Sequence, residues 1–328
     1  MFGAVLLSGA HPAAAHCGHI EIAELPWESA SLIANIDRLI LSAGYDCRVS
    51  LVTEDTLAII ESMESKGRPD IASELWTNNF PGSVRAVVAT GELVIANNGP
   101  ISGLGEGWWI PAYTAAAHPE LKTVRDVINR PELFADDTDP TQGAFIGCPR
   151  GWVCSQINMN LFRAFKMRSK GWKLITPKTG EALNSSINKA NFSKKNWFGY
   201  YWTPTPLIGK HAMVRLDFGE PFAGDDNWEN CVSIEVLKCK KPKPSAWKPA
   251  EAATLVTAHF KETAGQEVMG YLKKRVFPSE VMNKLLFDMQ DSQISSSDMA
   301  SVFMSEYQDL WALWVSKSVA KKIQARIN

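Results

Sequence analysis

The sequence predicts an α/β protein made of two units, each with a β-sheet flanked by helices. Three observations support this fold class. From residue 18 onward, the hydrophobic pattern alternates between the period of a strand and the period of a helix, which predicts sheets with right-handed crossovers. A second alternation of the same kind begins at Ala144. The length of 328 residues leaves room for about two domains of roughly 150 residues each.

The first unit is expected to contain three strands separated by two helices. The strands span His19–Glu24, Arg48–Val52 and Asp70–Leu75, and the helices span Glu28–Ser42 and Asp55–Lys66. Gly44 follows the first helix at the place of a C-cap. Strands that are joined by helices pair in parallel, so we expect a parallel sheet here.

The second unit follows a glycine-rich stretch, ISGLGEG, which leads into a short strand at Trp108–Pro111. Its later strands are expected at Ala144–Gly147, Trp172–Thr176, Trp197–Trp202 and Met213–Phe218, with helices at about 155–167 and at Gly180–Phe192. A run between Cys231 and Cys239, VSIEVLK, also has the pattern of a strand. A last strand is expected at Ala252–Phe260, followed by helices to the end of the chain.

The composition excludes several classes of function. The formal charge is −1, from 34 basic and 35 acidic residues, which argues against a nucleic-acid or anionic-membrane partner bound by charge alone. After the first segment, no apolar run is long enough to span a bilayer. The six histidines are scattered, and no nucleophile, zinc-protease or phosphate-loop motif occurs.

The N-terminus and the cysteines indicate export. Residues 1–16 resemble the remnant of a signal peptide, because a short apolar run is followed by small residues that fit a cleavage site. The cysteine count is six, an even number. Three disulfides in an oxidising compartment are the simplest interpretation. The expected bonds are Cys17–Cys47, Cys148–Cys154 and Cys231–Cys239.

Four of the twelve tryptophans lie at strand ends or in the adjoining loops. They are Trp27, Trp76, Trp152 and Trp202, two from each unit. In open parallel sheets, ligands bind outside the carboxyl ends of the strands, so these indoles could form a box. Such a box suits a methylated ammonium group, with about 0.5–2 kcal/mol for each cation–π contact. The alternative is that these rings pack between the sheet and its helices.

The chain resembles the substrate-binding proteins of the glycine betaine/proline-betaine ABC transporter family. The resemblance rests on the runs GYDCRVSLVTEDT, GRPDIASELW, EGWWIP, GCPRGWVC and GYYWTPT, which cover nearly the whole mature chain. It implies a two-lobe periplasmic-binding fold of type II that closes on its ligand at a hinge. It also implies delivery to a membrane permease driven by an ATPase. By the same resemblance, Trp76, Trp152 and Trp202 are cage residues, Trp27 completes a four-tryptophan box, and Cys148–Cys154 is a disulfide.

Within this family, the chain is most similar to the trimethylamine N-oxide binding branch, because of EGWWIP and the remaining four cysteines. That branch implies a ligand contact from Glu106. The chemistry agrees, since a pocket carboxylate would repel the carboxylate of a betaine but could share a proton with an N-oxide. Trp108 and Trp109 are further candidates beside the hinge. Arg150 could serve a carboxylate ligand, which keeps a betaine open. The alternative ligands within the family are glycine betaine, proline betaine, choline and carnitine.

The resemblance implies a monomeric, non-enzymatic protein of the periplasm. One lobe is expected at 17–110 and 217–328, the other at 111–216, with crossings near Trp109–Pro111 and Arg215–Phe218. The competing hypotheses are an exported enzyme that uses Glu106 as an acid/base on methylamines, and the receptor domain of a sensor or fused permease.

Two groups of acidic residues are candidate calcium ligands, because Ca²⁺ prefers carboxylate oxygens. The first group is Asp136, Asp137 and Asp139, and the second is Asp225 and Asp226. Neither group has EF-hand spacing, so we expect charged solvent loops and no cofactor.

Overall fold

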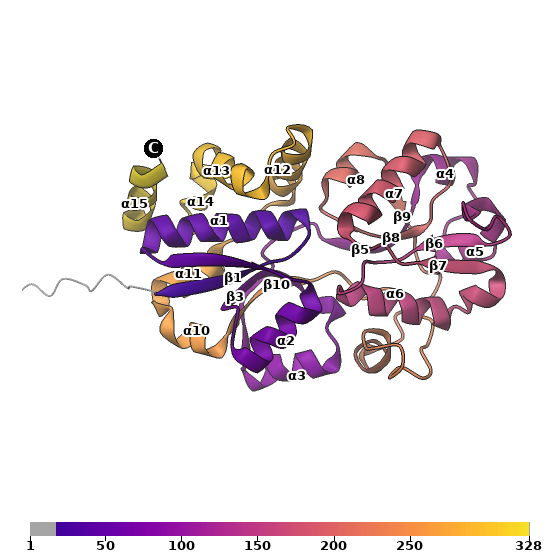
Figure 1. Cartoon of the computed structure of the whole chain (residues 1–328), viewed down its shortest axis with the longest axis horizontal. Helices are drawn as coiled ribbons and strands as arrows, with labels where there is room; N and C mark the ends of the chain where they lie inside the picture. Colours follow the sequence, from indigo (N-terminus) through magenta and orange to yellow (C-terminus); the bar gives the residue numbers. More distant parts are fainter. Residues whose placement is uncertain (1–17, 328) are drawn as a thin grey trace, which may run out of the picture.

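The computed structural model describes residues 18–327. It contains two five-stranded sheets, each flanked by helices, which lie side by side in Figure 1 and form two lobes. We name the body built on the N-terminal sheet the first lobe and the other the second lobe. The two-unit α/β prediction is therefore confirmed.

The sheet of the first lobe has the strand order β2-β1-β3-β10-β4. Its strands are β1 (His19–Glu24), β2 (Arg48–Thr53), β3 (Ile71–Trp76), β4 (Leu93–Asn98) and β10 (Ala252–Thr257). Strand β1 is parallel to β2 and β3, as predicted, whereas β10 is antiparallel to β3 and β4. The late strand β10 thus joins the sheet built by the beginning of the chain.

The sheet of the second lobe has the order β7-β6-β8-β5-β9. Its strands are β5 (Gly105–Pro111), β6 (Gly143–Ile146), β7 (Trp172–Ile175), β8 (Gly199–Thr203) and β9 (Met213–Arg215). Strand β6 is parallel to β7 and β8, and β5 is antiparallel to β8 and β9. Both sheets are therefore mixed.

The chain passes from the first sheet to the second between β4 and β5, and it returns between β9 and β10. We expected the first passage near Trp109–Pro111. Strand β5 already pairs within the second sheet from Gly105 onward, so the chain passes between the sheets before Gly105. The assignment of 17–110 and 217–328 to one lobe and of 111–216 to the other stays a prediction.

Helices cover both faces of each sheet (Figure 1). Those of the first lobe are α1 (Glu28–Tyr45), α2 (Thr56–Lys66), α3 (Gly82–Thr90), α10 (Ala258–Thr263), α11 (Gly265–Lys274), α12 (Ser279–Asp291), α13 (Ser296–Glu306), α14 (Gln308–Trp311) and α15 (Lys317–Ile327). Those of the second lobe are α4 (Ala112–Ala117), α5 (Val124–Ile128), α6 (Val153–Ala164), α7 (Gly180–Ser193) and α8 (Pro206–Lys210). A short helix, α9 (Asp225–Asn227), lies in the returning segment.

Gly44 does not cap the first helix, so that prediction was wrong. Helix α1 continues to Tyr45, and its C-cap is Asp46 with a φ of 59°. A Cβ on Gly44 would lie 2.8 Å from Cγ1 of Val319 on α15. The glycine therefore serves close packing between α1 and α15 and not a turn.

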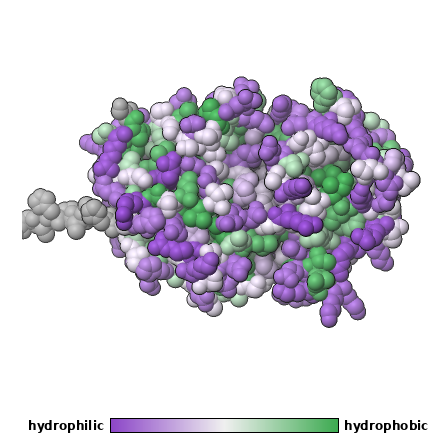
Figure 2. Space-filling view, in the orientation of Figure 1, coloured by the Kyte–Doolittle hydropathy of each residue, from purple (hydrophilic) through white to green (hydrophobic). Residues whose placement is uncertain are grey.

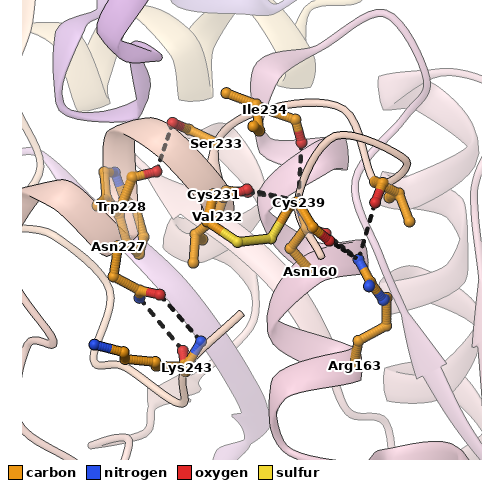
Figure 3. The surroundings of a disulfide bond; sticks show 11 residues. Asn160, Arg163, Asn227, Trp228, Cys231, Val232, Ser233, Ile234, Cys239 and Lys243 are labelled. Carbon is orange, nitrogen blue, oxygen red and sulfur yellow. Dashed lines mark hydrogen bonds between the residues drawn. A yellow bond between two sulfur atoms is a disulfide. The ribbon is translucent and has the colours of Figure 1, made fainter. Parts of the chain in front are cut away.

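The strand expected between Cys231 and Cys239 is also wrong. Trp228–Val232 forms a π-helical turn, and non-strand backbone follows it. Figure 3 shows Asn160 of α6 donating from Nδ2 to the carbonyls of Cys231 and Ile234, at 3.1 and 2.8 Å. These carbonyls therefore have a side-chain partner in place of a neighbouring strand.

Two of the three predicted disulfides are confirmed, namely Cys148–Cys154 and Cys231–Cys239. The third involves Cys17, which lies outside the described residues, as does the signal-peptide segment 1–16. That bond was expected because the two strands that follow Cys17 and Cys47 should begin next to each other. Strands β1 and β2 do begin side by side, with His19 opposite Arg48.

The described residues include no helix that is long and apolar enough to cross a membrane. Figure 2 shows a mainly hydrophilic face over both lobes, interrupted by small hydrophobic patches.

Candidate ligand site: a tryptophan cage between the lobes

The four predicted tryptophans line one cavity. Trp27 directly precedes α1, Trp76 ends β3, Trp152 directly precedes α6, and Trp202 lies on β8. The chain therefore supplies two indoles from each lobe. Trp76 lies at the carboxyl end of the parallel strand β3, and Trp27 follows that of β1, where open sheets place their ligands.

The rings of this cage contact one another edge to face. The centroids of Trp27 and Trp152 are 5.4 Å apart with an interplanar angle of 65°, and those of Trp152 and Trp202 are 5.3 Å apart at 74°. This geometry is favourable for aromatic pairs and leaves ring faces available to the cavity. Trp152 contacts both neighbours and is the central ring of the cage.

The remaining wall of the cavity is largely polar but contains a single charged residue. Besides the four indoles, it is formed by Thr56, Asn79, Glu106, Val153, Cys154 and Tyr200. Glu106 is the one Asp, Glu, Lys or Arg side chain in this lining. The site thus combines aromatic faces with a single carboxylate, which suits a small group of positive charge.

Glu106 is 4% exposed and surrounded by hydrogen-bond donors. Asn79 Nδ2 donates to both of its oxygens at 2.8 and 2.9 Å, Tyr200 donates its hydroxyl at 2.6 Å, and Asn78 donates at 3.1 Å. Burial raises the pKa of Glu106, and these hydrogen bonds oppose the rise. The carboxylate is thereby fixed in one orientation at the wall of the cavity.

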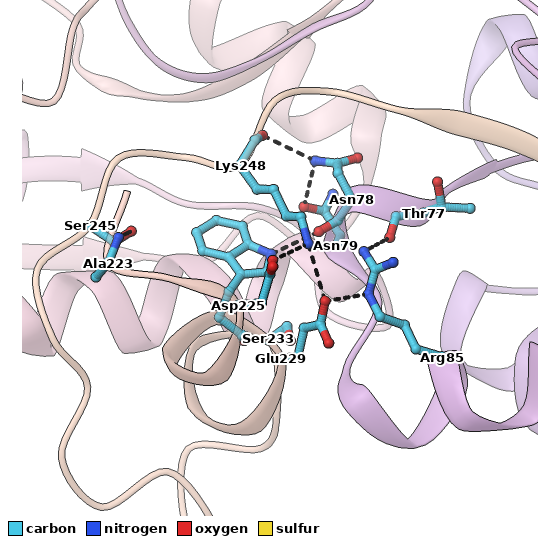
Figure 4. Close-up of polar contacts among 11 residues, drawn as sticks. Thr77, Asn78, Asn79, Arg85, Ala223, Asp225, Glu229, Ser233, Ser245 and Lys248 are labelled. Atoms are coloured by element: carbon cyan, nitrogen blue, oxygen red, sulfur yellow. Dashed lines mark hydrogen bonds and ion pairs between the residues drawn. The ribbon is translucent and has the colours of Figure 1, made fainter. Parts of the chain in front are cut away.

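Asn78 is held in place by the segment that returns to the first lobe, and it donates in turn to Asn79 Oδ1 at 3.1 Å (Figure 4). Trp228 Nε1 donates to the carbonyl of Asn78 at 2.7 Å, and Asn78 Nδ2 reaches the carbonyl of Lys248 at 3.5 Å. Arg85 pairs with Glu229 at 2.6 Å. The donors that orient Glu106 therefore depend on residues far away in the sequence.

Glu74 lies behind the two indoles of the first lobe. Its Oε1 accepts hydrogen bonds from Trp27 Nε1 at 2.8 Å, from Trp76 Nε1 at 2.9 Å and from Ser29 Oγ at 3.1 Å. The side chain is fully buried, and burial raises the pKa of Glu74 to about 7.

The two lobes are in contact around the cage. Asn184 of α7 donates to Glu28 of α1 at 3.0 Å, and the amide of Leu57 donates to the carbonyl of Gly151 at 3.2 Å. Burial raises the pKa of Glu28, and hydrogen bonds oppose the rise. These contacts hold the two lobes together beside the cage.

Three further predicted candidates do not line the cavity. Trp108 packs in the core of the second lobe against Phe145 and donates to Asn158 Oδ1 at 2.7 Å. Trp109 donates to the carbonyl of Tyr201 at 2.8 Å. Arg150 is exposed and is absent from the cavity wall. A direct ligand contact from these residues has no support in this geometry.

The acidic loop residues are engaged with other side chains. Asp136 pairs with Lys173 at 2.5 Å, Asp137 with Lys189 at 3.0 Å, and Asp225 with Lys248 at 2.6 Å. Asp139 accepts from Thr141 at 2.6 Å, and Asp226 accepts from Asn230 at 3.0 Å. Over residues 18–327, no group of three or more His, Cys, Asp or Glu side chains is arranged to hold a metal.

Sequence reasoning missed Thr56, Asn79, Val153 and Tyr200 in the cavity wall, and Glu74 behind it. Tyr200 had a usable signal, because it lies two positions before Trp202 on one strand and shares its side of the sheet. Asn79 and Glu74 had no such signal, since their roles depend on groups from distant segments.

With this geometry established, comparison with known proteins identifies the family. The family model OpuAC, described as the substrate binding domain of ABC-type glycine betaine transport systems, matches residues 18–306. The chain belongs to this family. Proteins of the OpuAC family bind small quaternary-amine ligands and work with the permease of an ABC transporter, so the chain is a substrate-binding protein and not an enzyme.

Solved structures share the OpuAC fold over nearly the whole chain. An ABC-transporter choline-binding protein in complex with choline has a TM-score of 0.74 at 14% identity, covering 95% of this chain and 99% of that one. The glycine betaine/L-proline-binding protein of Borrelia burgdorferi has a TM-score of 0.69 at 11% identity, with 93% and 99% covered. Lactococcal OpuAC, closed on glycine betaine, has a TM-score of 0.66 at 14% identity, with 91% and 100% covered. At these identities the likeness shows the fold, and among curated proteins no match was found.

Proposed function

We propose that this protein binds trimethylamine N-oxide in the tryptophan cage and delivers it, in the periplasm, to an ABC permease. The observation that carries the proposal is the lining of the cavity. Its one Asp, Glu, Lys or Arg side chain is Glu106, and the indoles of Trp27, Trp76, Trp152 and Trp202 also line it. We infer that these five residues bind the ligand. The methyl groups of the ligand meet the indole faces, and its oxygen meets the polar side of the cavity near Glu106.

The charge of the wall favours an N-oxide over a betaine. A betaine carries a carboxylate, which Glu106 would repel at close range in a buried site. Arg150, the basic residue that could have compensated this charge, is exposed and does not line the cavity. An N-oxide oxygen instead is a hydrogen-bond acceptor that can share a proton with a carboxyl group of raised pKa.

Glycine betaine and choline are the second candidates. The family description names glycine betaine, and a choline-binding protein shares the fold. Choline is a cation and suits Glu106, but its hydroxyethyl arm needs more room than the oxygen of the N-oxide.

Isothermal titration calorimetry with trimethylamine N-oxide, glycine betaine, choline and carnitine tests the proposal. We expect the tightest binding for trimethylamine N-oxide, in the micromolar range, because three or four cation–π contacts of about 0.5–2 kcal/mol each add to the burial of three methyl groups and together offset the ordering costs. Binding of glycine betaine without the N-oxide would overturn the ligand assignment. Binding of none of the four would overturn the role of the cage.

The matched control is Glu106→Gln, which keeps the size of the side chain and removes its charge. We expect trimethylamine N-oxide to bind about tenfold more weakly to this variant, because one charge-assisted interaction is lost. Glycine betaine should bind equally well or better. A fall in betaine affinity that equals the fall for the N-oxide would show that Glu106 acts only on the shape of the site.

A further inference from the structure

Glu74 has an unusual combination of contacts for a buried carboxylate. It lies on β3 and is 0% exposed, and a single oxygen, Oε1, accepts from Trp27, Trp76 and Ser29. Its other oxygen, Oε2, has no hydrogen-bond partner among the described residues. A buried carboxylate oxygen without a partner is costly, so a role in the site would account for its presence.

The shared acceptor couples two rings that come from different segments. Trp27 follows β1, whereas Trp76 ends β3, yet both indole N–H groups point to the same oxygen atom. A ring that is held at its N–H can only pivot about that point. One side-chain conformation of Glu74 therefore sets the orientation of both first-lobe walls of the cage.

The charge of Glu74 also acts on the cavity. The carboxylate lies at the N–H edges of two indoles that line the cavity, and little water screens its interaction with a ligand in a closed site. An N–H group that donates to an anion also polarises its indole and makes the ring face more negative. Both effects favour a positive group against the faces of Trp27 and Trp76.

The other charged groups near Glu74 leave this effect in place. Arg275 is the cation that acts on it, but the guanidinium of Arg275 is paired with Asp37 at 2.9 Å. Tyr271 donates to Asp37 as well. On the second-lobe side, Glu106 is a further carboxylate. The surroundings are thus close to neutral on the core side of β3 and negative on the side of the cage.

We propose that Glu74 is a positioning residue of the cage, which fixes Trp27 and Trp76 and supplies the negative charge by which the site selects a methylated nitrogen over a neutral group of the same shape. This inference rests on the proposed function, because it concerns the same site.

The test compares two probes of nearly equal shape, trimethylamine N-oxide and tert-butanol, on the full chain and on Glu74→Gln. Glutamine keeps an oxygen that accepts from both indoles but carries no charge. We expect the dissociation constant of trimethylamine N-oxide to rise about tenfold, while that of tert-butanol changes less than about twofold. The matched control is Glu61→Gln on the exposed face of α2, which should leave both constants unchanged.

A pH series with tetramethylammonium, which does not titrate, gives a second readout that does not depend on a variant. A bound cation favours the ionised form of Glu74, so the affinity of the natural protein should rise as pH increases from 6 to 8. In Glu74→Gln, the affinity for tetramethylammonium should rise less over the same pH range, because glutamine does not titrate.

The outcomes separate the two proposals. If the natural protein binds methylated amines but Glu74→Gln has the same selectivity and the same pH profile, the positioning role of Glu74 is wrong and the proposed function stands. A flat pH profile in the natural protein leads to the same conclusion even if the variant does not fold. If the natural protein binds no methylated amine, the proposed function fails and this inference fails with it.

Discussion

The two halves of the cage are held in different ways. In the first lobe, Trp27 and Trp76 donate to one oxygen of Glu74. In the second lobe, Trp152 and Trp202 contact each other edge to face, and the carboxylate beside them, Glu106, accepts from four donor contacts. In the first half, both indoles are therefore positioned by one fully buried acid. In the second half, Trp152 has a hydrogen bond to a partly buried acid of the other lobe, Asp55, and Trp202 is positioned by ring packing.

This difference separates the expected consequences of mutation. A change in charge at Glu74 should affect stability and selectivity, because the acid is buried and incompletely paired. A change in shape in the second half should act on affinity through lost contacts.

The largest expected effect concerns stability and pH. The pKa of Glu74 is raised from 4.5 to about 7 in the folded protein, so this group stabilises the fold at low pH, and its contribution is lost as pH rises through about 7. Relative to Glu74→Gln, the natural protein should lose up to about 3 kcal/mol of unfolding free energy between pH 4.5 and pH 8. Urea unfolding at several pH values measures this difference. Parallel stability curves for the two proteins would contradict the prediction, and Glu61→Gln is the exposed control.

The next effect concerns the central ring of the second half. Trp152→Ala removes one face of the cage and the edge contacts with Trp27 and Trp202. We expect affinity for trimethylamine N-oxide to fall by about 2–3 kcal/mol, or roughly 30- to 150-fold. Calorimetry measures the loss. The control is Trp108→Phe, which changes a large ring outside the cavity wall; an unchanged affinity in Trp152→Ala would mean that Trp152 only packs.

The smallest effect concerns the contact between the lobes. Asn184→Ala removes the hydrogen bond to Glu28 and should favour separation of the lobes. We expect affinity to fall about two- to tenfold, the range for one hydrogen bond worth about 0.5–1.5 kcal/mol. Small-angle X-ray scattering without ligand should show a larger radius of gyration for the variant. The same radius and the same affinity would assign Asn184 a role within the second lobe alone, through its bond with Tyr201 at 2.7 Å.

Sequence reasoning located the cage because strand ends are visible in a hydrophobic pattern. Trp27 follows one parallel strand and Trp76 ends another, and the rule that ligands bind at the carboxyl ends of such strands predicted that they lie together. The family resemblance supplied Glu106, which does lie in the cavity wall.

The missed features depend on tertiary contacts. Helix α3 and strand β4 were not predicted, and β4 belongs to the sheet through its pairing with β10, which is distant in the sequence. The run between Cys231 and Cys239 has strand-like alternation. Its carbonyls instead accept hydrogen bonds from the side chain of Asn160, which belongs to another segment. Gly44 was interpreted as a cap because a glycine near the end of a helix usually has that role. Its actual role, close packing against α15, depends on a helix at the other end of the chain.

The ring pair Trp27–Trp152 joins the two lobes, whereas the pair Trp152–Trp202 lies within one. Neighbouring indoles couple electronically, and the coupling produces paired bands in circular dichroism that vanish when the rings separate. Opening of the lobes should therefore abolish one band pair and preserve the other. The circular-dichroism signal of the Trp27–Trp152 pair should therefore report the equilibrium between open and closed lobes without any attached label.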